Sequence, residues 1–315
     1  MTTLLVSQSN YADHVTPAGK PERADRITAI EDALARTRFD GLLRRDAPYG
    51  DLTLADLVHD PRYLSVLRDI RPAEGLAPID SDTYISAGSL DVVATGIGGA
   101  LNALDAVLLG QADNAFCAIR PPGHHAEYAR PMGFCLINTV AITAREAQRK
   151  YGAERVAIID FDVHHGNGTQ DIFKADPSVF YASSHEMPLF PGTGKPSETG
   201  VGNIVNVALN AGSGGAEMRD AYLTRIIPAL IDFSPDVILF SAGFDAHELD
   251  PLAHLRWQSS DYSWLTGKLM DVAERYCGNR IVSLLEGGYD LKGLAGGVSH
   301  HVAMLMDGAV GRLEE

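Results

Sequence analysis

Cysteine is scarce in this sequence, which has only Cys117, Cys135 and Cys277 among its 315 residues. The three stand far apart in apolar segments, and no Cys-x-x-Cys pattern of a thiolate metal site occurs. Secreted domains that depend on disulfides are much richer in cysteine. We therefore expect reduced thiols in a hydrophobic core, and neither a disulfide framework nor a cysteine-based zinc site.

Basic residues are few as well. The chain has 26 Lys and Arg against 41 Asp and Glu, which gives a formal net charge of -15. No run rich in Lys or Arg interrupts this excess of acid, whereas proteins that bind nucleic acid carry a basic patch or stripe. We expect no nucleic-acid partner. An acidic surface attracts cationic substrates, but only weakly favours them as the partner.

Long apolar runs are missing too, since none approaches the ~18–20 residues that a membrane span needs. The first residues, Met-Thr-Thr-Leu-Leu-Val, lack the basic region and the apolar stretch of a signal peptide. These absences predict a cytoplasmic protein with no membrane contact. They leave open whether the chain forms a homo-oligomer.

The composition that remains, 45% hydrophobic and 21% charged, is that of an ordinary soluble globular protein. Short apolar runs alternate with segments of helical periodicity, which predicts βαβ units and a mostly parallel sheet flanked by helices. No repeat or linker divides the chain, so we expect one domain over residues 1–315. Strands are expected at residues 3–7, 114–119, 156–160, 179–182, 204–208, 235–240 and 280–285. Helices are expected at residues 24–37, 53–58, 86–109, 138–150, 216–233, 261–276 and 294–306, with a long loop over 71–84.

Polar or glycine-rich motifs follow five of these strands directly. In open α/β sheets, binding sites form outside the carboxyl ends of the strands. Five motifs at one edge therefore predict a single site there. The motifs occupy residues 120–125, 160–167, 183–185, 241–245 and 286–289.

The segment around Asp160, Asp162 and His164 is the most informative of these motifs. Side chains alternate between the two faces of a strand, so residues at i, i+2 and i+4 are expected to point the same way. Two carboxylates and an imidazole on one buried face repel one another unless a cation or a hydrogen-bond network compensates. A single polar residue here would usually cap the strand end, but three in this register favour a cation.

Asp162 and His164 supply two metal ligands, and Asp245 is the best candidate for a third. Asp245 ends an apolar strand in the sequence Ala-Gly-Phe-Asp, where glycine permits a close backbone approach. Two carboxylates and one imidazole suit a catalytic Zn²⁺, although Fe²⁺ or Mn²⁺ would also accept them. The alternative for Asp245 is a helix N-cap ahead of Ala246.

Two adjacent histidines, His124 and His125, follow the stiff turn Pro-Pro-Gly. One could accept a proton from water while the other donates one to a leaving group. The alternative is one functional ring beside one structural ring. Asp160 is then expected to hold a histidine or a second cation, and Asn167 to orient the other histidine.

Tyr289 ends another strand after two glycines, where its hydroxyl could donate a hydrogen bond to a developing oxyanion. The alternative is a tyrosine at the edge of the core. Met187, Leu189 and Phe190 precede Pro-Gly-Thr-Gly and predict a rim or wall for the site.

Together these motifs resemble the zinc-dependent histone deacetylase superfamily over nearly the whole chain and in the same order. Asp-x-Asp-Val-His-His-Gly-Asn-Gly and Glu-Gly-Gly-Tyr are similar to the class II branch, which includes bacterial deacetylase-like amidohydrolases and acetylpolyamine amidohydrolases. The resemblance implies the arginase/deacetylase α/β fold with about eight mostly parallel strands. It is carried by residues 120–126, 133–138, 160–170, 190–194, 241–246, 250–252 and 286–289.

The resemblance also implies roles for individual residues. It implies one Zn²⁺ on Asp162, His164 and Asp245. It implies that His125 is the general base and acid, that His124 is positioned by Asp160, and that Tyr289 polarises the acyl carbonyl. Substrate contacts are implied for Phe134 and Phe190 as tunnel walls, Asp82 at the polar rim, Gly133 and Leu252. A monovalent cation, K⁺, is implied at Asp160, Asp162, His164, Ser183 and Ser184.

The implied reaction is hydrolysis of an amide on an acyl-lysine or a similar N-acyl amine, with release of acetate. The alternative substrate is a small N-acetylated polyamine. Leu252 weakens that alternative without excluding it, because only the eukaryotic polyamine-selective relatives carry an acidic residue there. Lys20 stands where many relatives have histidine before Pro-Glu. A metal-binding protein without turnover is disfavoured by Tyr289, and an arginase-like ureohydrolase by the lack of ligands for two metals.

Overall fold

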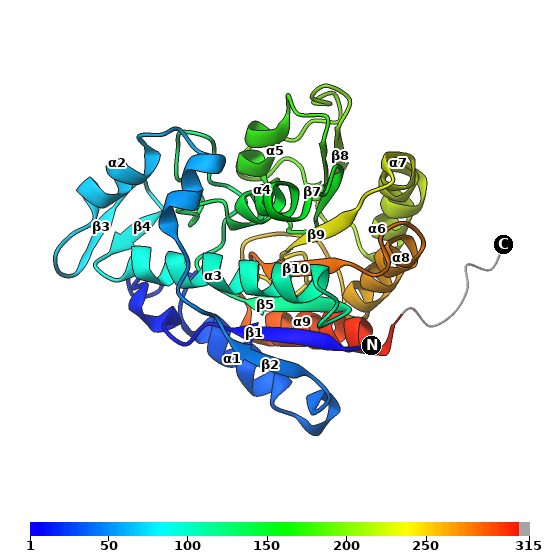
Figure 1. Cartoon of the computed structure of the whole chain (residues 1–315), viewed down its shortest axis with the longest axis horizontal. Helices are drawn as coiled ribbons and strands as arrows, with labels where there is room; N and C mark the ends of the chain where they lie inside the picture. The colour runs from blue at the N-terminus through cyan, green and yellow to red at the C-terminus, as the bar shows by residue number, and fades with distance from the viewer. Residues whose placement is uncertain (309–315) are drawn as a thin grey trace.

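The computed structural model describes residues 1–308, and its centre is an eight-stranded sheet in which every neighbouring pair is parallel (Figure 1). The expected end of the domain at residue 315 lies outside the described residues. The order across the sheet is β2-β1-β5-β10-β9-β6-β7-β8. The strands are β1 (Thr3–Ser7), β2 (Leu43–Asp46), β5 (Asn114–Ala118), β6 (Val156–Asp160), β7 (Val179–Glu186), β8 (Ile204–Leu209), β9 (Val237–Ala242) and β10 (Ile281–Leu285).

The strand β6 shows why these apolar runs become central strands. Ala157 and Ile159 pack into the core on one side of the sheet, and Val156 and Ile158 pack into the core on the other. Both faces are therefore buried, as in other parallel sheets covered by helices. Because β6 pairs with both β7 and β9, the residues that follow these three strands emerge side by side.

Helices cover both faces of the sheet (Figure 1). One face packs against α1 (Asp25–Leu34), α6 (Gly215–Ala221), α7 (Ile227–Phe233), α8 (Ser259–Cys277) and α9 (Leu291–Asp307). The other packs against α2 (Tyr63–Ile70), α3 (Ser89–Leu108), α4 (Thr139–Tyr151) and α5 (Asn167–Phe173). The three cysteines are buried and form no disulfide in the described residues, as predicted.

The helix α3 is long and apolar enough to cross a membrane, and 78% of the window with that property is buried inside the fold. Its glycines explain this burial. A Cβ on Gly98 would lie 2.0 Å from the carbonyl oxygen of Pro48, so only glycine lets the neighbouring loop pass so close. The helix is therefore part of the core.

The prediction from the sequence did not include several of the observed elements. Residues 71–84, expected to form a loop, include β3 (Leu76–Pro78) and the start of β4 (Tyr84–Ser86), which form an antiparallel hairpin. The edge strand β2 was missed because its sequence, Leu-Arg-Arg-Asp, is polar and mostly exposed. The helices α2 and α5 were also missed, and residues 52–57 form a 3₁₀ helix. The helix expected at 216–233 is interrupted by a π-helical segment, Tyr222–Ile226.

Candidate active site

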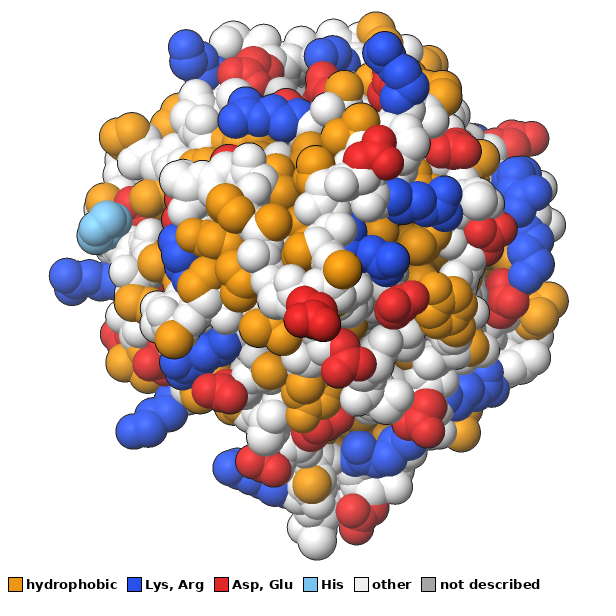
Figure 2. All heavy atoms as spheres, turned by 90° about the vertical axis from the view of Figure 1, so that its left-hand side faces the viewer, with side chains coloured by type: hydrophobic (Ala, Val, Ile, Leu, Met, Phe, Trp, Pro, Cys, Tyr) orange, Lys and Arg blue, Asp and Glu red, His pale blue; other side chains and the backbone are white. Residues whose placement is uncertain are grey.

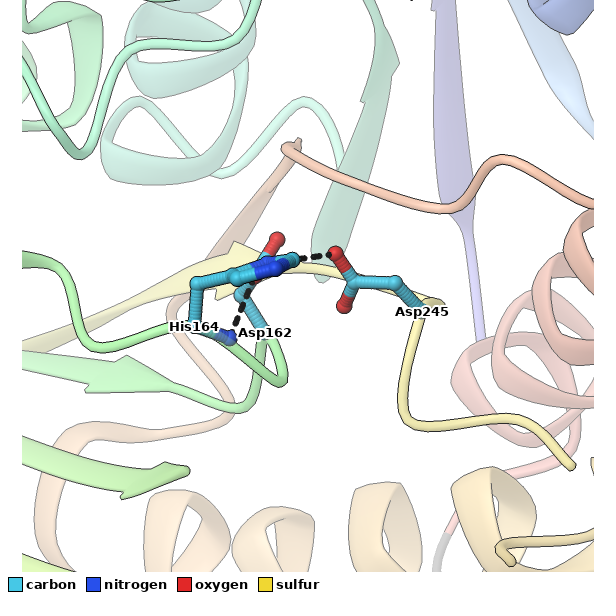
Figure 3. Close-up of side chains that lie close together, drawn as sticks. All are labelled: Asp162, His164 and Asp245. Carbon is cyan, nitrogen blue, oxygen red and sulfur yellow. Dashed lines mark hydrogen bonds and ion pairs between the residues drawn. The ribbon is translucent and has the colours of Figure 1, made fainter. Parts of the chain in front are cut away.

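Asp162, His164 and Asp245 come together at the carboxyl edge of the sheet (Figure 3). Asp162 and His164 lie in the loop after β6, and Asp245 lies in the loop after its neighbour β9. The Nδ1 atom of His164 is 3.1 Å from Asp162 Oδ1 and 3.2 Å from Asp245 Oδ2. All three side chains are buried, and one potential ligand atom from each lies within 4.8 Å of the others.

Asp160, which was expected on the same face, is not part of this group of potential ligands. The strand β6 ends at Asp160, and the residues beyond it follow a loop rather than a strand. The Asp160 carboxylate instead accepts a hydrogen bond from the Tyr181 hydroxyl at 2.9 Å and lies 3.0 Å from Nδ1 of His124. Asp160 therefore supports a histidine, which was the other role expected for it.

Two glycines lie directly against the carboxylates of the Asp162–His164–Asp245 group. A Cβ on Gly287 would lie 2.1 Å from Asp245 Oδ2 and 2.5 Å from Asp162 Oδ2, and a Cβ on Gly243 would lie 2.2 Å from Asp162 Oδ2. The Gly287 amide donates to Asp162 Oδ2 at 2.8 Å. The two glycines thus form a cradle that any larger residue would fill.

The charge balance of this group fits a cation. Burial raises the pKa of Asp245 to about 7, and the negative charge of Asp162 adds to that rise. A bound divalent ion favours the ionised form of such carboxyls. Two carboxylate oxygens and one imidazole nitrogen, with room left for a further ligand, match the donors of a catalytic zinc site. The residues present therefore fit the metal that the sequence predicts.

The hydrogen bonds of His125 fix which of its nitrogens carries the proton. Its Nδ1 lies 2.8 Å from Oδ1 of Asn167, whose Nδ2 donates to Glu127 Oε1 at 2.7 Å. The amide oxygen can only accept, so Nδ1 of His125 is the donor and Nε2 keeps its lone pair. Burial, reinforced by the neighbouring rings of His124 and His164, holds the pKa of His125 well below its usual value. His125 is therefore a neutral base.

His124 is in the opposite electrostatic situation, although its ring centre is only 4.0 Å from that of His125. Burial opposes its charged form, but the carboxylates of Asp160, Asp162 and Glu286 outweigh this and raise its pKa well above the usual value. The pair therefore divides into one neutral and one cationic ring.

We expect Asn167→Ala to lower kcat/KM by about 10- to 100-fold, less than the ~10²–10⁴ that a general base contributes in full. The amide no longer selects the Nδ1–H tautomer, so a fraction of the His125 rings lose their basic Nε2. Asn167→Asp tests the same contact with a charge. A carboxylate raises the pKa of His125, and because the base must be unprotonated, the acidic limb of the kcat/KM profile should move to higher pH. An unmoved limb would contradict this positioning role.

Tyr289 lies against the same group. Its backbone N–H donates to Asp250 Oδ2 at 2.7 Å, and the guanidinium of Arg26 stacks 5.0 Å from the centre of its ring. Within the described residues, the Tyr289 hydroxyl makes no hydrogen bond, and the side chain lines the pocket. Burial raises the pKa of Tyr289 well above its usual value, so the hydroxyl keeps its proton and can donate it in a hydrogen bond.

A cavity of about 300 Å³ leads from these groups to the surface. The residues for which the resemblance implied substrate contacts all line this one cavity, whereas Met187, expected as part of the rim, is not among its lining residues. At its floor, His125, His164 and Tyr289 are buried, while Phe190 is 44% exposed at the mouth. The lining residues are Lys20, Pro21, Asp82, His125, Gly133, Phe134, His164, Leu189, Phe190, Leu252 and Tyr289.

The backbone at Gly133 and Phe134 bends sharply to form one wall of the cavity. Both residues have positive φ values, 58° and 67°, and the Phe134 N–H donates to Thr83 Oγ1 at 3.1 Å. A Cβ on Gly133 would lie 2.5 Å from the ring of His125, so glycine is required there. Figure 2 looks onto this end of the molecule, where hydrophobic side chains lie exposed between charges of both signs.

The residues expected to hold a monovalent cation lie on neighbouring strands. Ser183 pairs with Asp160 across β6 and β7, which places them side by side. The Ser183 hydroxyl lies 2.9 Å from His185 Nδ1, and the Ser184 hydroxyl lies 3.0 Å from the Tyr222 hydroxyl. Both hydroxyls therefore already have protein partners.

Two acidic residues that support the site lie in motifs identified in the sequence, 250–252 and 286–289, but neither was assigned this supporting role. Glu286 accepts hydrogen bonds from the N–H groups of Gly123 at 2.7 Å and His124 at 3.2 Å, and so fixes the loop that carries the histidine pair. Asp250 fixes Tyr289, as described above. An acidic residue that ends an apolar strand, as Glu286 does, was the available signal. For Asp250 the resemblance supplied a motif but no role.

Comparison with known proteins agrees with this arrangement. A family model described as "Histone deacetylase domain" matches residues 20–305. "Histone deacetylase 14, chloroplastic" of Arabidopsis thaliana is 40% identical over 309 residues, covering 91% of this chain and 73% of the relative. "Histone deacetylase-like amidohydrolase" of Pseudomonas aeruginosa is 37% identical over 278 residues, covering 86% of this chain and 72% of the relative.

A solved structure shares the fold. "Crystal Structure of HDA15 HD domain" superposes with a TM-score of 0.91 and 32% sequence identity, and the match covers 98% of this chain and 90% of that one. The eight-stranded parallel sheet and its helical layers are thus those of a known catalytic fold, as the sequence motifs implied. The chain belongs to the histone deacetylase family of amide hydrolases.

Proposed function

We propose that the chain is a zinc-dependent deacetylase that hydrolyses the amide of an acyl-lysine or similar N-acyl amine and releases acetate. One observation carries this proposal. The buried group Asp162–His164–Asp245 lies at the floor of a largely apolar pocket, beside a neutral histidine with a free Nε2 and a phenol with a free hydroxyl. Two carboxylates among the ligands leave Fe²⁺ and Mn²⁺ as alternative metals.

His125, Tyr289 and His124 each have a separate role in the proposed hydrolysis. The metal, when bound, supplies Lewis acidity to the scissile carbonyl and lowers the pKa of water. His125 accepts the proton of the attacking water at Nε2, and Asn167 holds its Nδ1–H in place. The Tyr289 hydroxyl donates a hydrogen bond to the oxygen that gains negative charge. His124, held in its cationic form by Asp160, positions the water and supports His125, and a histidine of the pair protonates the leaving amine.

The apolar walls of the pocket fit the part of the substrate that lies beyond the amide. Phe134 and Phe190 line the cavity between the buried floor and the mouth. Aromatic walls suit the methylene stem of an acyl-lysine, because they exclude water from the stem and position the amide over the catalytic groups. Leu252 extends this apolar lining to the side of the mouth.

The second candidate is an acetylpolyamine amidohydrolase, favoured by the net charge of -15. The test is to assay an acetyl-lysine peptide, acetylputrescine and acetylspermidine side by side, before and after chelation and after readdition of Zn²⁺, Fe²⁺ or Mn²⁺. We expect the peptide to be cleaved and activity to disappear with the metal. Cleavage of acetylpolyamines orders of magnitude faster than the peptide would establish the second candidate instead. Activity that survives complete metal removal would contradict both.

K⁺ binding at Asp160, the carbonyls of Asp162 and His164, and the two serines is a separate proposal that rests on the family resemblance. Activity and thermal stability measured in potassium and in tetramethylammonium salts test it. The cytoplasmic location stays a prediction from the sequence.

A further inference from the structure

Two charged side chains face each other at the mouth of the pocket. Lys20 and Asp82 are the only Lys, Arg, Asp or Glu among the described residues that line it, and Lys20 Nζ lies 3.0 Å from Asp82 Oδ1. Lys20 comes from the loop before α1, and Asp82 from the turn between β3 and β4. The ion pair therefore joins two loops, because its two residues are separated by 62 positions in the sequence.

Lys20 is held in this place by more than Asp82. Its Nζ donates to the carbonyl oxygen of Ser81 at 3.2 Å and lies 5.3 Å from the centre of the Tyr84 ring. The side chain is 28% exposed, against 57% for Asp82. A lysine ammonium has three N–H donors. Two of them bind Ser81 and Asp82, so one remains for a substrate.

Both oxygens of the Asp82 carboxylate likewise accept hydrogen bonds from protein groups. Asp82 Oδ1 accepts from Lys20, and Oδ2 accepts from the Ser81 hydroxyl at 3.0 Å. The charge of Asp82 is thus neutralised where a substrate enters, even though the whole chain is strongly acidic. A second ammonium group on a substrate stem would meet the Lys20 ammonium beside it instead of an unpaired carboxylate.

We propose that Lys20 is a specificity-determining residue, which favours an acylated amine that carries a carbonyl or carboxylate acceptor near the mouth and disfavours one with a second positive charge there. This inference rests on the proposed function and names its substrate class. An acyl-lysine within a peptide has backbone carbonyls at the end of its stem. An N-acetylpolyamine has ammonium groups along its stem and no such acceptor.

The test compares kcat/KM for an acetyl-lysine peptide and for N-acetylspermidine in the wild type, Lys20→Met and Lys20→Glu, assayed with metal bound. Lys20→Met keeps an apolar stem but removes the charge. We expect it to shift the preference toward N-acetylspermidine by about 1.5- to fivefold, the size of an exposed charge interaction, mostly through KM. Lys20→Glu should shift it further. Because exposed charges are screened, the shift should shrink at high salt.

Lys150→Met is the matched control. Lys150 forms the same kind of contact, 2.8 Å from Asp105 Oδ2 and 5.2 Å from the Tyr151 ring centre, at the end of α4 that leads into the start of β6. It lies at the opposite edge of the sheet from the pocket, so its loss should leave the preference unchanged. An unchanged preference in active Lys20 variants, or an equal shift in the control, overturns this inference alone. A wild type that cleaves neither substrate overturns the proposed function, and this inference with it.

Discussion

Replacing Gly287 with alanine is expected to abolish detectable hydrolysis, a loss of at least about three decades in kcat/KM. The new Cβ would lie 2.1 Å from Asp245 Oδ2 and 2.5 Å from Asp162 Oδ2, distances that no real Cβ contact reaches. Asp245 Oδ2 would have to move by about 1 Å and Asp162 Oδ2 by at least about 0.5 Å, and a displacement of about 1 Å alone can cost about 100-fold. Weaker metal binding increases that loss further. Even residues that only hydrogen-bond to metal ligands contribute about 10- to 100-fold to metal affinity or activity.

The measurement is metal content and kcat/KM of the purified variant, with circular dichroism to show that it is folded. Gly96→Ala is the control. Gly96 is also buried, in α3, but its added Cβ would make only ordinary contacts, the nearest at 3.6 Å from Gln8 Nε2. The control should keep its metal and its activity. A Gly287→Ala protein with normal metal content and turnover would show that the cradle does not hold the ligands.

Removal of one oxygen atom, in Tyr289→Phe, is expected to lower kcat by about two to three decades while the metal stays bound. The hydroxyl is free of protein partners within the described residues and keeps its proton, so its one task in the site is to donate to the substrate oxygen. The ring and its stacking on Arg26 remain in the variant. The loss should therefore fall on kcat more than on KM.

Metal content and steady-state kinetics of the same preparation decide this prediction. Tyr262→Phe is a suitable control, because that hydroxyl is buried without a hydrogen-bond partner and its loss removes no bond. Its kcat should stay near that of the wild type. Loss of metal in Tyr289→Phe would mean that the role given to the phenol is wrong, and a kcat near that of the wild type would mean that the oxyanion is stabilised elsewhere.

The central strands could be predicted because a strand that is buried on both faces has a mostly apolar sequence. The strands β5, β6, β9 and β10 are predominantly apolar runs, and each was located to within two residues. The periphery could not be predicted in this way. The edge strand β2 and the hairpin strand β3 are mostly exposed, and its partner β4 has only three residues, so no apolar pattern marks them. They are specified by contacts with segments distant in the sequence, as when Leu4 pairs with Leu43.

The same distinction applies to the site. Asp162, His164 and Asp245 were predicted because each follows a buried strand, and parallel strands bring such residues to one edge. Supports such as Glu127, which orients Asn167 from another loop, depend on tertiary contacts that no local pattern reveals.

The two ends of the pocket are built from different parts of the chain. The floor depends on residues that follow β6, β9 and β10 and on glycines that tolerate no side chain, whereas the mouth consists of loops around Lys20, Asp82 and Phe190 that supply none of the predicted metal ligands. Mutations in the Lys20 and Asp82 loops can therefore accumulate without displacing the metal ligands, whereas Phe190 lies with its ring centre 5.1 Å from that of His125. Such a division lets an ancestral amide hydrolase diverge toward new acylated amines through loop changes alone, and makes this rim the natural region to randomise when selecting altered substrate ranges.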